Sequence, residues 1–568
     1  MNYTADFETT TDPDDCRVWA WAVCDIDNPD DVTHGIDLDE FMLFCEQSKN
    51  SRFLFHNLKF DGEFIINWLF RNGFRHVQDR DEVTDRTFTT LISDTGLFYS
   101  MEVYWKVESR KKAKKAVFRD SLKVLPMSVK AVAKAFGLPI SKLEIDYDKP
   151  RPVGYELDQQ ELDYLQNDVR IMALAMQQMF KANMTSMTTG ANALKDFKDT
   201  LGRYDFKRVF PILEPMVDYE IRQAYKGGFT FADPRFRMHD MGAGIVLDVN
   251  SLYPSTMRFQ AMPYGEPLPF IGQYKRNRLY SLYVQRLTCV FELKSGHIPT
   301  IQIHGHRSFM PQEYLTSSGG LEVALTLTSV DEKLFFEHYD VSCIEYLGGW
   351  MFKATTGLFD EYIDRWTAIK IEATESGNKG MRQIAKLMLN SLYGKFGLNP
   401  NVRSRYPVFV NDTVHYVTGP AETRDPIYIP VAAFITAYAR DKTIRAAQQV
   451  YNRFMYADTD SLHLAGTELP AGLEIDPGEL GKWSHELTFS AARYIRAKSY
   501  MELGREPGSS EPETWRVTCA GMPGACHGAV SFENFKPGSS YPGKLVPKHV
   551  PGGIVLQETS FTIKDDKI

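Results

Sequence analysis

Tyr456-Ala457-Asp458-Thr459-Asp460-Ser461 is the stretch that decides the fold of this chain. It places two acids side by side where a hairpin between apolar strands is predicted. Acids this close repel each other and serve no packing purpose, so a bound cation would explain them. The alternative is that both are ordinary turn residues.

A further acid is expected beside this hairpin. Asp248-Val249-Asn250-Ser251-Leu252-Tyr253-Pro254 ends an apolar strand that is predicted to begin at Gly244. Hard oxygen ligands favour Mg²⁺ or Mn²⁺, and two such ions stabilise both the attacking and the leaving oxygen of a phosphoryl displacement. We expect Asp248 and Asp460 to bind metal directly, with the Val249 carbonyl contributing and Asp458 in support.

Between these acidic motifs, a helix is predicted around Lys386-Leu387-Met388-Leu389-Asn390-Ser391-Leu392-Tyr393-Gly394. Spacings of four and three residues put Lys386, Asn390 and Tyr393 on one face, with Arg382 one turn earlier. Lys386 can neutralise phosphate charge. The alternative is an amphipathic helix with a solvated polar stripe, and both interpretations can hold together.

Another set of acids lies in the N-terminal third of the chain. Asp6 and Glu8 are two apart on a predicted strand and so share one face, Asp61 opens a predicted helix, and Tyr164 and Asp168 share a helical face. Four carboxylates gathered from distant segments would need cations, which again favours Mg²⁺ or Mn²⁺. Tyr164 could then orient an attacking water. Alone, Asp6 and Glu8 are more typical of a solvated edge strand.

Bulk properties fit a globular protein of three or four domains. The 568 residues are 43% hydrophobic and 24% charged, without an apolar run long enough to span a bilayer and without a signal peptide. The seven scattered cysteines indicate neither a disulfide framework nor a zinc site. The net charge of −8 argues mildly against nucleic-acid binding, but residues 1–50 alone carry −11 and the rest of the chain carries +3.

Taken together, the motifs resemble those of a known family. The stretches at Asp248, Lys386 and Tyr456 resemble motifs A, B and C of family B DNA polymerases, and the N-terminal acids resemble the three exonuclease motifs of the DnaQ-like proofreading fold. Over about residues 1–564, the chain is similar to the protein-primed family B polymerases of phi29-type bacteriophages.

The resemblance assigns roles to individual residues. It implies a nucleotide pocket in which the Tyr253 ring excludes a 2′-hydroxyl, and a catalytic lysine at Lys142, for which the alternative is a solvated side chain. Ser121 could equally be a helix cap. The nucleotide-binding residues would be Leu252, Tyr253, Arg382, Lys386, Asn390 and Tyr393. The DNA-binding residues would be Asn57, Phe60, Ser121, Leu122, Tyr225, Gly227, Gly228, Lys498 and Tyr500.

The implied fold class is α/β and α+β multidomain, with a ribonuclease H-like (DnaQ-like) exonuclease domain and a right-hand polymerase. The expected segments are the exonuclease (1–190), palm (191–260 and 427–530), insertion 1 (261–358), fingers (359–398), insertion 2 (399–426) and thumb (531–568). We expect short strands in 261–358, irregular chain from Asn399 to Asp425 and a Gly/Pro-rich tail. The basic cluster Ser109–Lys115 is a solvated hairpin tip or a DNA contact.

The implied function is DNA-directed DNA synthesis with 3′–5′ proofreading, two divalent ions per active site, and processive, strand-displacing replication of a linear phage genome. The implied partners are primer-template DNA, deoxynucleotides, a terminal protein that forms a heterodimer and supplies the priming hydroxyl, and phage single-stranded and double-stranded DNA-binding proteins. The implied location is the bacterial host cytoplasm. The alternatives are an RNA-primed family B polymerase, a stand-alone exonuclease and a non-catalytic nucleic-acid-binding scaffold.

Overall fold

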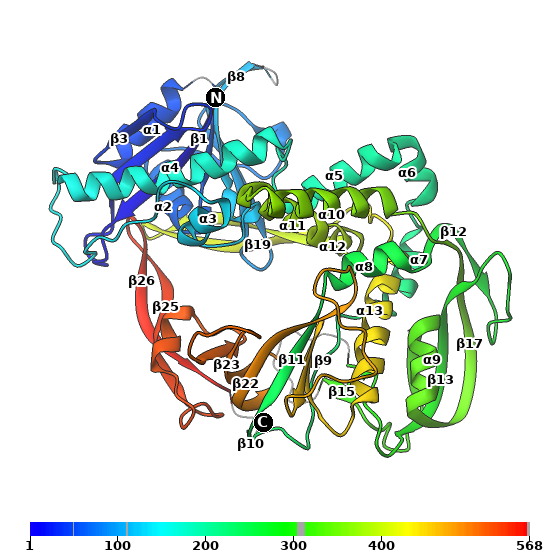
Figure 1. Cartoon of the computed structure of the whole chain (residues 1–568). Coiled ribbons are helices and arrows are strands. Elements are labelled where there is room, and N and C mark those ends of the chain that lie inside the picture. Colours follow the sequence, from blue (N-terminus) through cyan, green and yellow to red (C-terminus); the bar gives the residue numbers. More distant parts are fainter. Residues whose placement is uncertain (49, 110–111, 304–312, 565–568) are drawn as a thin grey trace.

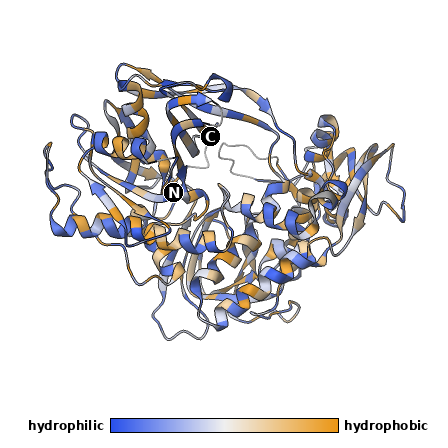
Figure 2. Ribbon diagram, turned by 90° about the horizontal axis from the view of Figure 1, so that it is seen from above, coloured by the Kyte–Doolittle hydropathy of each residue, from blue (hydrophilic) through white to orange (hydrophobic). Residues whose placement is uncertain are grey.

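The computed structural model describes residues 1–48, 50–109, 112–303 and 313–564. In Figure 1 an N-terminal α/β domain lies on one side, a second α/β domain with helices lies below and beside it, and a separate sheet projects at the far edge. Hydrophobic and hydrophilic segments alternate along the helices in Figure 2, as expected of helices that bury one face. Among the described residues, no helix is long and apolar enough to cross a membrane.

The N-terminal domain is built on a mixed sheet covered on both faces. Its central strand β1 pairs antiparallel with β2 and parallel with β4. Successive side chains of β2 alternate between two cores, one shared with α4 and the other with α1 and α2. The predicted α/β domain is confirmed. Its elements are β1 (Asn2–Thr9), β2 (Val18–Asp25), β3 (Val32–Gly35), α1 (Leu38–Gln47), β4 (Arg52–Phe55), α2 (Leu58–Arg71), β5 (Arg75–His76), β6 (Thr87–Ser93), β7 (Phe98–Ser109), β8 (Lys112–Asp120), α3 (Val129–Phe136) and α4 (Gln159–Lys181).

The basic cluster Ser109–Lys115 lies where β7 meets β8, with Ser109 opposite Lys112. Arg110 and Lys111 of that cluster lie outside the described residues. Lys114 Nζ is 2.9 Å from Glu46 Oε1, and Lys115 Nζ is 2.8 Å from Glu102 Oε2. The hairpin is confirmed, and a DNA contact stays a prediction.

A second sheet carries the Tyr456–Ser461 motif. Its strand order is β24-β23-β22-β11-β21-β20-β9, and α13 and α8 pack on one face. The elements of this region are α5 (Thr189–Leu201), α6 (Arg203–Val209), α7 (Pro215–Arg222), β9 (Thr230–Ala232), β10 (Asp240–Met241), β11 (Gly244–Val249), α8 (Leu252–Phe259), α13 (Ile429–Gln449), β20 (Phe454–Asp458), β21 (Ser461–Ala465), β22 (Trp483–Arg496), β23 (Ser499–Arg505) and β24 (Thr514–Cys519).

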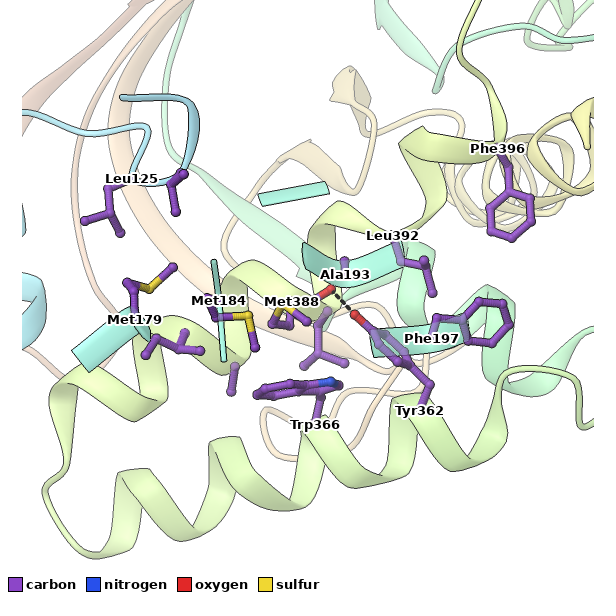
Figure 3. Packing of buried hydrophobic residues seen from close by; sticks show 14 of the residues in the cluster. Leu125, Met179, Met184, Ala193, Phe197, Tyr362, Trp366, Met388, Leu392 and Phe396 are labelled. Carbon is purple, nitrogen blue, oxygen red and sulfur yellow. Dashed lines mark hydrogen bonds between the residues drawn. The ribbon is translucent and has the colours of Figure 1, made fainter. Parts of the chain in front are cut away.

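A helical pair connects the two large domains. It consists of α10 (Asp360–Glu375) and α11 (Lys379–Ser391), followed by the short α12 (Tyr393–Phe396). Figure 3 shows Tyr362 and Trp366 of α10 directed towards α11, where the Tyr362 hydroxyl donates to the Met388 carbonyl over 2.8 Å. Residues of α4 and α5 join the same core, so α11 is fixed against the N-terminal domain.

Residues 261–358 form a sheet of order β12-β17-β13-β16. The expectation of short strands holds for β14, β15 and β16 but was wrong for β17, which runs for 17 residues. Bulges interrupt its pairing with β13, one of them beside Gly348 at φ +95°, so a long strand can twist without ending. The elements are β12 (Met262–Phe270), β13 (Leu282–Leu293), β14 (Ile301–Gln302), β15 (Tyr314–Leu315), β16 (Val323–Thr328), α9 (Ser329–His338) and β17 (Tyr339–Thr355).

The segment from Asn399 to Asp425 is not irregular, contrary to expectation. It forms a hairpin of β18 (Asn401–Val410) and β19 (Thr413–Thr423), and β18 pairs with β6, so the hairpin extends the sheet of the N-terminal domain. Asn411 and Asp412 both have positive φ, as a two-residue hairpin turn requires. The pair Asn411-Asp412 is a turn signal that is visible in the sequence.

The C-terminal tail was expected to be Gly/Pro-rich chain, but it is ordered as a hairpin of β25 (Ser540–Val550) and β26 (Gly553–Thr562). Its tip packs into the N-terminal domain: Val550, Ile554 and Val555 join the core around Phe64, and Cys16 Sγ donates to the Ile554 carbonyl over 3.6 Å. The hairpin therefore bridges the two large domains, as the red strands in Figure 1 show.

Candidate active sites

The first carboxylate site lies at the β20–β21 hairpin. Its turn residue Thr459 has φ +65°, and its flanking acids are Asp458 and Asp460. Strand β11 pairs with β21 so that Asp248 lies opposite Ser461, and the Val249 amide donates to the Asp460 carbonyl over 2.9 Å. Asp248 and Asp460 are therefore neighbours, as the sequence analysis requires.

Electrostatics at this site favour a bound cation. Burial, with Asp460 and Glu486 nearby, raises the pKa of Asp248 to about 8. Burial also raises the pKa of Asp460 to about 6, with Asp458 and Glu486 adding to the effect. The positive charge of Lys386 on α11 acts in the opposite direction on the pKa of Asp248. Repelling oxygen donors of this kind suit a hard divalent ion.

The Asp458 carboxylate is bound by neighbouring polar side chains. Its Oδ1 is 2.5 Å from Lys498 Nζ and accepts from Thr230 Oγ1 over 3.3 Å. The Lys498 amide donates to the Tyr456 hydroxyl over 2.7 Å, and the rings of Tyr456 and Tyr500 lie 4.8 Å apart. The predicted DNA contacts Lys498 and Tyr500 are thus adjacent to the acids.

The residues of the predicted nucleotide pocket lie on α8, α11 and α12. The rings of Tyr253 and Tyr393 stack with centroids 4.0 Å apart. Arg382, Lys386 and Asn390 are exposed on α11, whereas Tyr393 follows the helix break at Leu392 and is half-buried. Leu252 is the exception: its side chain is buried in the core beneath β11, and its carbonyl accepts from the hydroxyls of Ser255 and Thr256.

The second carboxylate site is in the N-terminal domain. Asp6 and Glu8 lie on β1, Asp61 in the first turn of α2 and Asp168 on α4, and all but the half-buried Asp6 are buried. Burial and the charge of Asp168 raise the pKa of Asp6 to about 7, and burial with neighbouring acids raises the pKa values of Glu8 and Asp61. This is the mutual repulsion expected of the four acids.

Lys142 offsets part of this repulsion. Its ammonium group pairs with Asp168 Oδ2 and lies 3.0 Å from the Tyr164 hydroxyl. Asp168 Oδ1 is buried without a hydrogen-bond partner, which leaves an oxygen available to a cation. In the described part of the chain, no three His, Cys, Asp or Glu side chains are already arranged as a metal site. The fit to a divalent ion rests on the chemistry of the donors, because four carboxylates supply hard oxygen ligands.

Comparisons with known proteins identify the family. A family model described as "DNA polymerase type B, organellar and viral" matches residues 44–151 and 144–474. The chain belongs to this family. It is 45% identical to the DNA polymerase of Bacillus phage phi29, over 99% of both chains, and 34% identical to that of Streptococcus phage Cp-1, over 99% of this chain and 98% of the relative.

Solved structures agree with this assignment. The phi29 DNA polymerase complexed with primer-template DNA and incoming nucleotide substrates superposes with a TM-score of 0.93 at 45% identity, over 99% of this chain and 100% of that chain. An orthorhombic crystal form of the same polymerase gives 0.95 at 44% identity, with the same coverage. The resemblance found in the motifs is confirmed: the chain is a phi29-type phage DNA polymerase, a nucleotidyltransferase.

In this phi29-type polymerase, three of the predicted DNA contacts of the N-terminal domain are accessible and the fourth, Ser121, is buried. Asn57 is exposed, and Phe60 and Leu122 are half-buried. Ser121 is buried and saturated, because its hydroxyl donates to the Phe55 carbonyl over 3.0 Å and lies 3.0 Å from His56 Nδ1. The cap of this short turn is Asp120, which accepts from the Leu122 amide. Ser121 therefore orders the turn that carries Leu122.

The Tyr225–Gly228 segment reaches the polymerase site. A Cβ at Gly228 would lie 2.7 Å from Thr459 Cγ2 and 3.0 Å from the Tyr253 hydroxyl, so glycine is needed for close approach. The carbonyl of Gly227 accepts from Arg440 Nη1 over 2.7 Å, and Tyr225 is half-buried. This placement explains the glycine at 228, whereas a Cβ at Gly227 would make only an ordinary contact with Gln302 at 3.8 Å.

The sequence analysis missed two residues that the structure places at these sites. Glu486 on β22 raises the pKa of both Asp248 and Asp460, and it reaches them because β22 pairs with β11. The hydroxyl of Tyr147 is 2.7 Å from that of Tyr164. No spacing rule indicates either residue, because one depends on strand pairing and the other lies in an irregular segment.

Proposed function

We propose that this polymerase has two separate metal-dependent active sites, one for template-directed nucleotidyl transfer and one for 3′–5′ proofreading. The observation that carries the proposal is the pair of carboxylate clusters with raised pKa values, one around Asp248 and one around Asp6. Carboxylates that repel one another in two places indicate two cation sites.

At the polymerase site, Asp248, Asp460 and the Val249 carbonyl would hold the metal. Bound Mg²⁺ or Mn²⁺, two ions per site, would stabilise charge on the attacking and leaving oxygens. Lys386 faces the same acid, so it would meet the triphosphate, with Arg382 and Asn390 beside it on the exposed face of α11. The Tyr253 ring would lie under the sugar and exclude a 2′-hydroxyl.

At the exonuclease site, Asp6, Glu8, Asp61 and Asp168 would hold metal. The Tyr164 hydroxyl and Lys142 Nζ, which are 3.0 Å apart, would orient the attacking water. The Tyr147 hydroxyl would hold that of Tyr164. Leu122, Phe60 and Asn57 would contact the frayed 3′ end.

A cavity of about 950 Å³ supports a path for the primer strand towards the polymerase site. It reaches Thr459 in the turn between the catalytic acids. Its lining includes two acids, Asp233 and Glu313, and more basic residues, namely Arg235, Arg237, Arg496, Lys498 and Lys564. Basic side chains along such a path would contact phosphates and position the primer without reading its sequence.

The phi29-type membership supports the remaining functions that we propose. These are priming from a terminal-protein hydroxyl, processive and strand-displacing synthesis, cooperation with phage DNA-binding proteins, and action in the cytoplasm of a bacterial host. In this proposal, segments 261–358 and 399–426 are the two insertions of the protein-primed subgroup. Covalent attachment of a deoxynucleotide to a cognate terminal protein tests the priming step, and absence of attachment would favour RNA priming.

Paired substitutions test the two-site proposal. Asp248→Ala or Asp460→Ala should abolish nucleotide incorporation and leave degradation of a labelled single strand intact. Asp6→Ala combined with Asp168→Ala should have the reverse effect. Loss of both activities from either set would show that the sites are not separate.

A further inference from the structure

Beneath the polymerase acids lies a buried cluster of three polar residues: His463 on β21, Tyr494 on β22 and Glu502 on β23. Their exposed fractions are 2%, 0% and 3%. Glu502 Oε1 is 2.5 Å from His463 Nδ1 and accepts from the Tyr494 hydroxyl over 2.7 Å. Burying such groups costs free energy that apolar side chains of similar size would avoid, so their presence calls for a specific role.

The other edge of the His463 ring faces the catalytic turn. His463 Nε2 is 3.3 Å from the hydroxyl oxygen of Ser461, which directly follows Asp460. That hydroxyl oxygen in turn lies 3.5 Å from the Asp458 carbonyl. The ring is therefore connected to both sides of the turn that carries the acids.

The faces and edges of the same ring contact two tyrosines. Tyr456 and Tyr500 pack edge-to-face with it, at centroid distances of 5.0 and 5.1 Å. Tyr456 lies two residues before Asp458 on β20, and its hydroxyl accepts from the Lys498 amide. One imidazole thus touches the strand of the acids and the segment that pairs Lys498 with Asp458.

We propose that the His463–Glu502 pair is a positioning device for nucleotidyl transfer. Glu502 holds Nδ1 and so fixes the orientation of the ring, with Nε2 directed at Ser461. The fixed ring then holds Tyr456, Tyr500 and Ser461, which keeps the acidic turn and Lys498 in one relative geometry. Neither His463 nor Glu502 would touch DNA or nucleotide. Their effect would be on the rate of the chemical step rather than on nucleotide affinity.

The test separates hydrogen bonding from packing. His463→Phe keeps an aromatic ring and removes both nitrogens, Glu502→Met removes the acceptor, and Glu502→Gln keeps an acceptor oxygen. In nucleotide incorporation on a primed template, we expect His463→Phe and Glu502→Met to lower kcat by about 10- to 100-fold while KM for the nucleotide changes by less than about two-fold. Glu502→Gln should retain kcat to within about three-fold.

Met501→Ala is the matched control. Met501 neighbours Glu502 on β23, is fully buried and packs into the opposite core with Ile495 and Cys519. The Met501→Ala variant should have a lower thermal unfolding temperature and an unchanged kcat. If it lowers kcat as much as His463→Phe, or if Glu502→Gln is as damaging as Glu502→Met, the positioning role is overturned. Should His463→Phe fail to fold, the two Glu502 variants provide the same comparison.

Discussion

At the scale of residues, the proposed polymerase site consists of carboxylates that strand pairing brings together. Asp248 and Asp460 become neighbours because β11 lies next to β21. Each acid is harder to ionise in the folded protein than in a free peptide, since burial and like charges raise both pKa values. In the proposed site, metal binding and protonation would therefore compete at these two side chains.

This competition predicts a pH-dependent stabilisation by Mg²⁺. Because folding raises the pKa of Asp248 to about 8 and that of Asp460 to about 6, the metal-free fold loses stability as pH rises through these values. Mg²⁺ binds the ionised acids, so the rise in thermal unfolding temperature that it causes should be larger at pH 8 than at pH 6. Asp248→Asn should reduce that difference, and an equal Mg²⁺ effect at both pH values in the unmodified protein would refute the explanation.

Gly228 provides a test of close packing around the same turn. Gly228→Ala places a Cβ against Thr459 and Tyr253, so it should lower incorporation by about ten-fold or more and spare the exonuclease. The control is Gly242→Ala, where the described residues leave the Cβ position open. Steady-state incorporation kinetics on a primed template would compare the two variants, and equal effects would argue against the packing explanation.

At the scale of elements, the loop between α3 and α4 carries Lys142 and Tyr147 to the second carboxylate site, where we propose the exonuclease. A buried arginine clamps it: Arg151 Nη2 donates to the Asp146 carbonyl over 2.6 Å, and Nε donates to Glu161 Oε1 over 3.1 Å. Glu161 is also part of the capping box that starts α4. Arg151 thus connects the loop to α4, the helix that carries Asp168.

Removing this clamp should loosen the exonuclease site alone. Arg151→Met should reduce degradation of a labelled single strand by about ten-fold, because Lys142 and Tyr147 would no longer be held, while nucleotide incorporation remains. Lys149→Met is the control, since Lys149 contacts the same Glu161 from a more exposed position. A variant that degrades DNA at the normal rate would show that the clamp has no part in positioning.

At the scale of the whole molecule, the C-terminal hairpin joins the two large domains. Its tip enters the core of the N-terminal domain, and a Cβ at Gly553 would lie 2.6 Å from the ring of Phe64. The hairpin is therefore docked through a contact that tolerates little added volume. This docking links the N-terminal domain to the sheet that carries Asp248 and Asp460.

Gly553→Ala should weaken that docking. We expect shorter products per binding event and faster proteolytic cleavage in residues 540–562, with single-nucleotide incorporation nearly unchanged, because the active-site residues are not touched. Gly528→Ala, at a position that the described residues leave open, is the control. Primer extension with a DNA trap measures the product length, and unchanged lengths would show that the docked tip is not needed for processive synthesis.

The periodicity of the sequence was enough to predict many local features of this protein. Repeats of two or 3.6 residues predict the shared face of Asp6 and Glu8 and the pairing of Tyr164 with Asp168. They also predict the exposed stripe of Arg382, Lys386 and Asn390 and the hairpin strands beside Asp458 and Asp460. Such relations involve residues within one or two turns, so backbone geometry alone determines them.

Tertiary structure decided the relations between distant segments. Glu486 reaches the polymerase acids through strand pairing, β18 joins the sheet of the N-terminal domain, and the C-terminal tip packs beside Phe64. None of these follows from spacing, because sheet order and domain docking depend on which buried surfaces fit together across hundreds of residues. Burial also raises the pKa of the acids, so their need for a cation is a property of the folded chain.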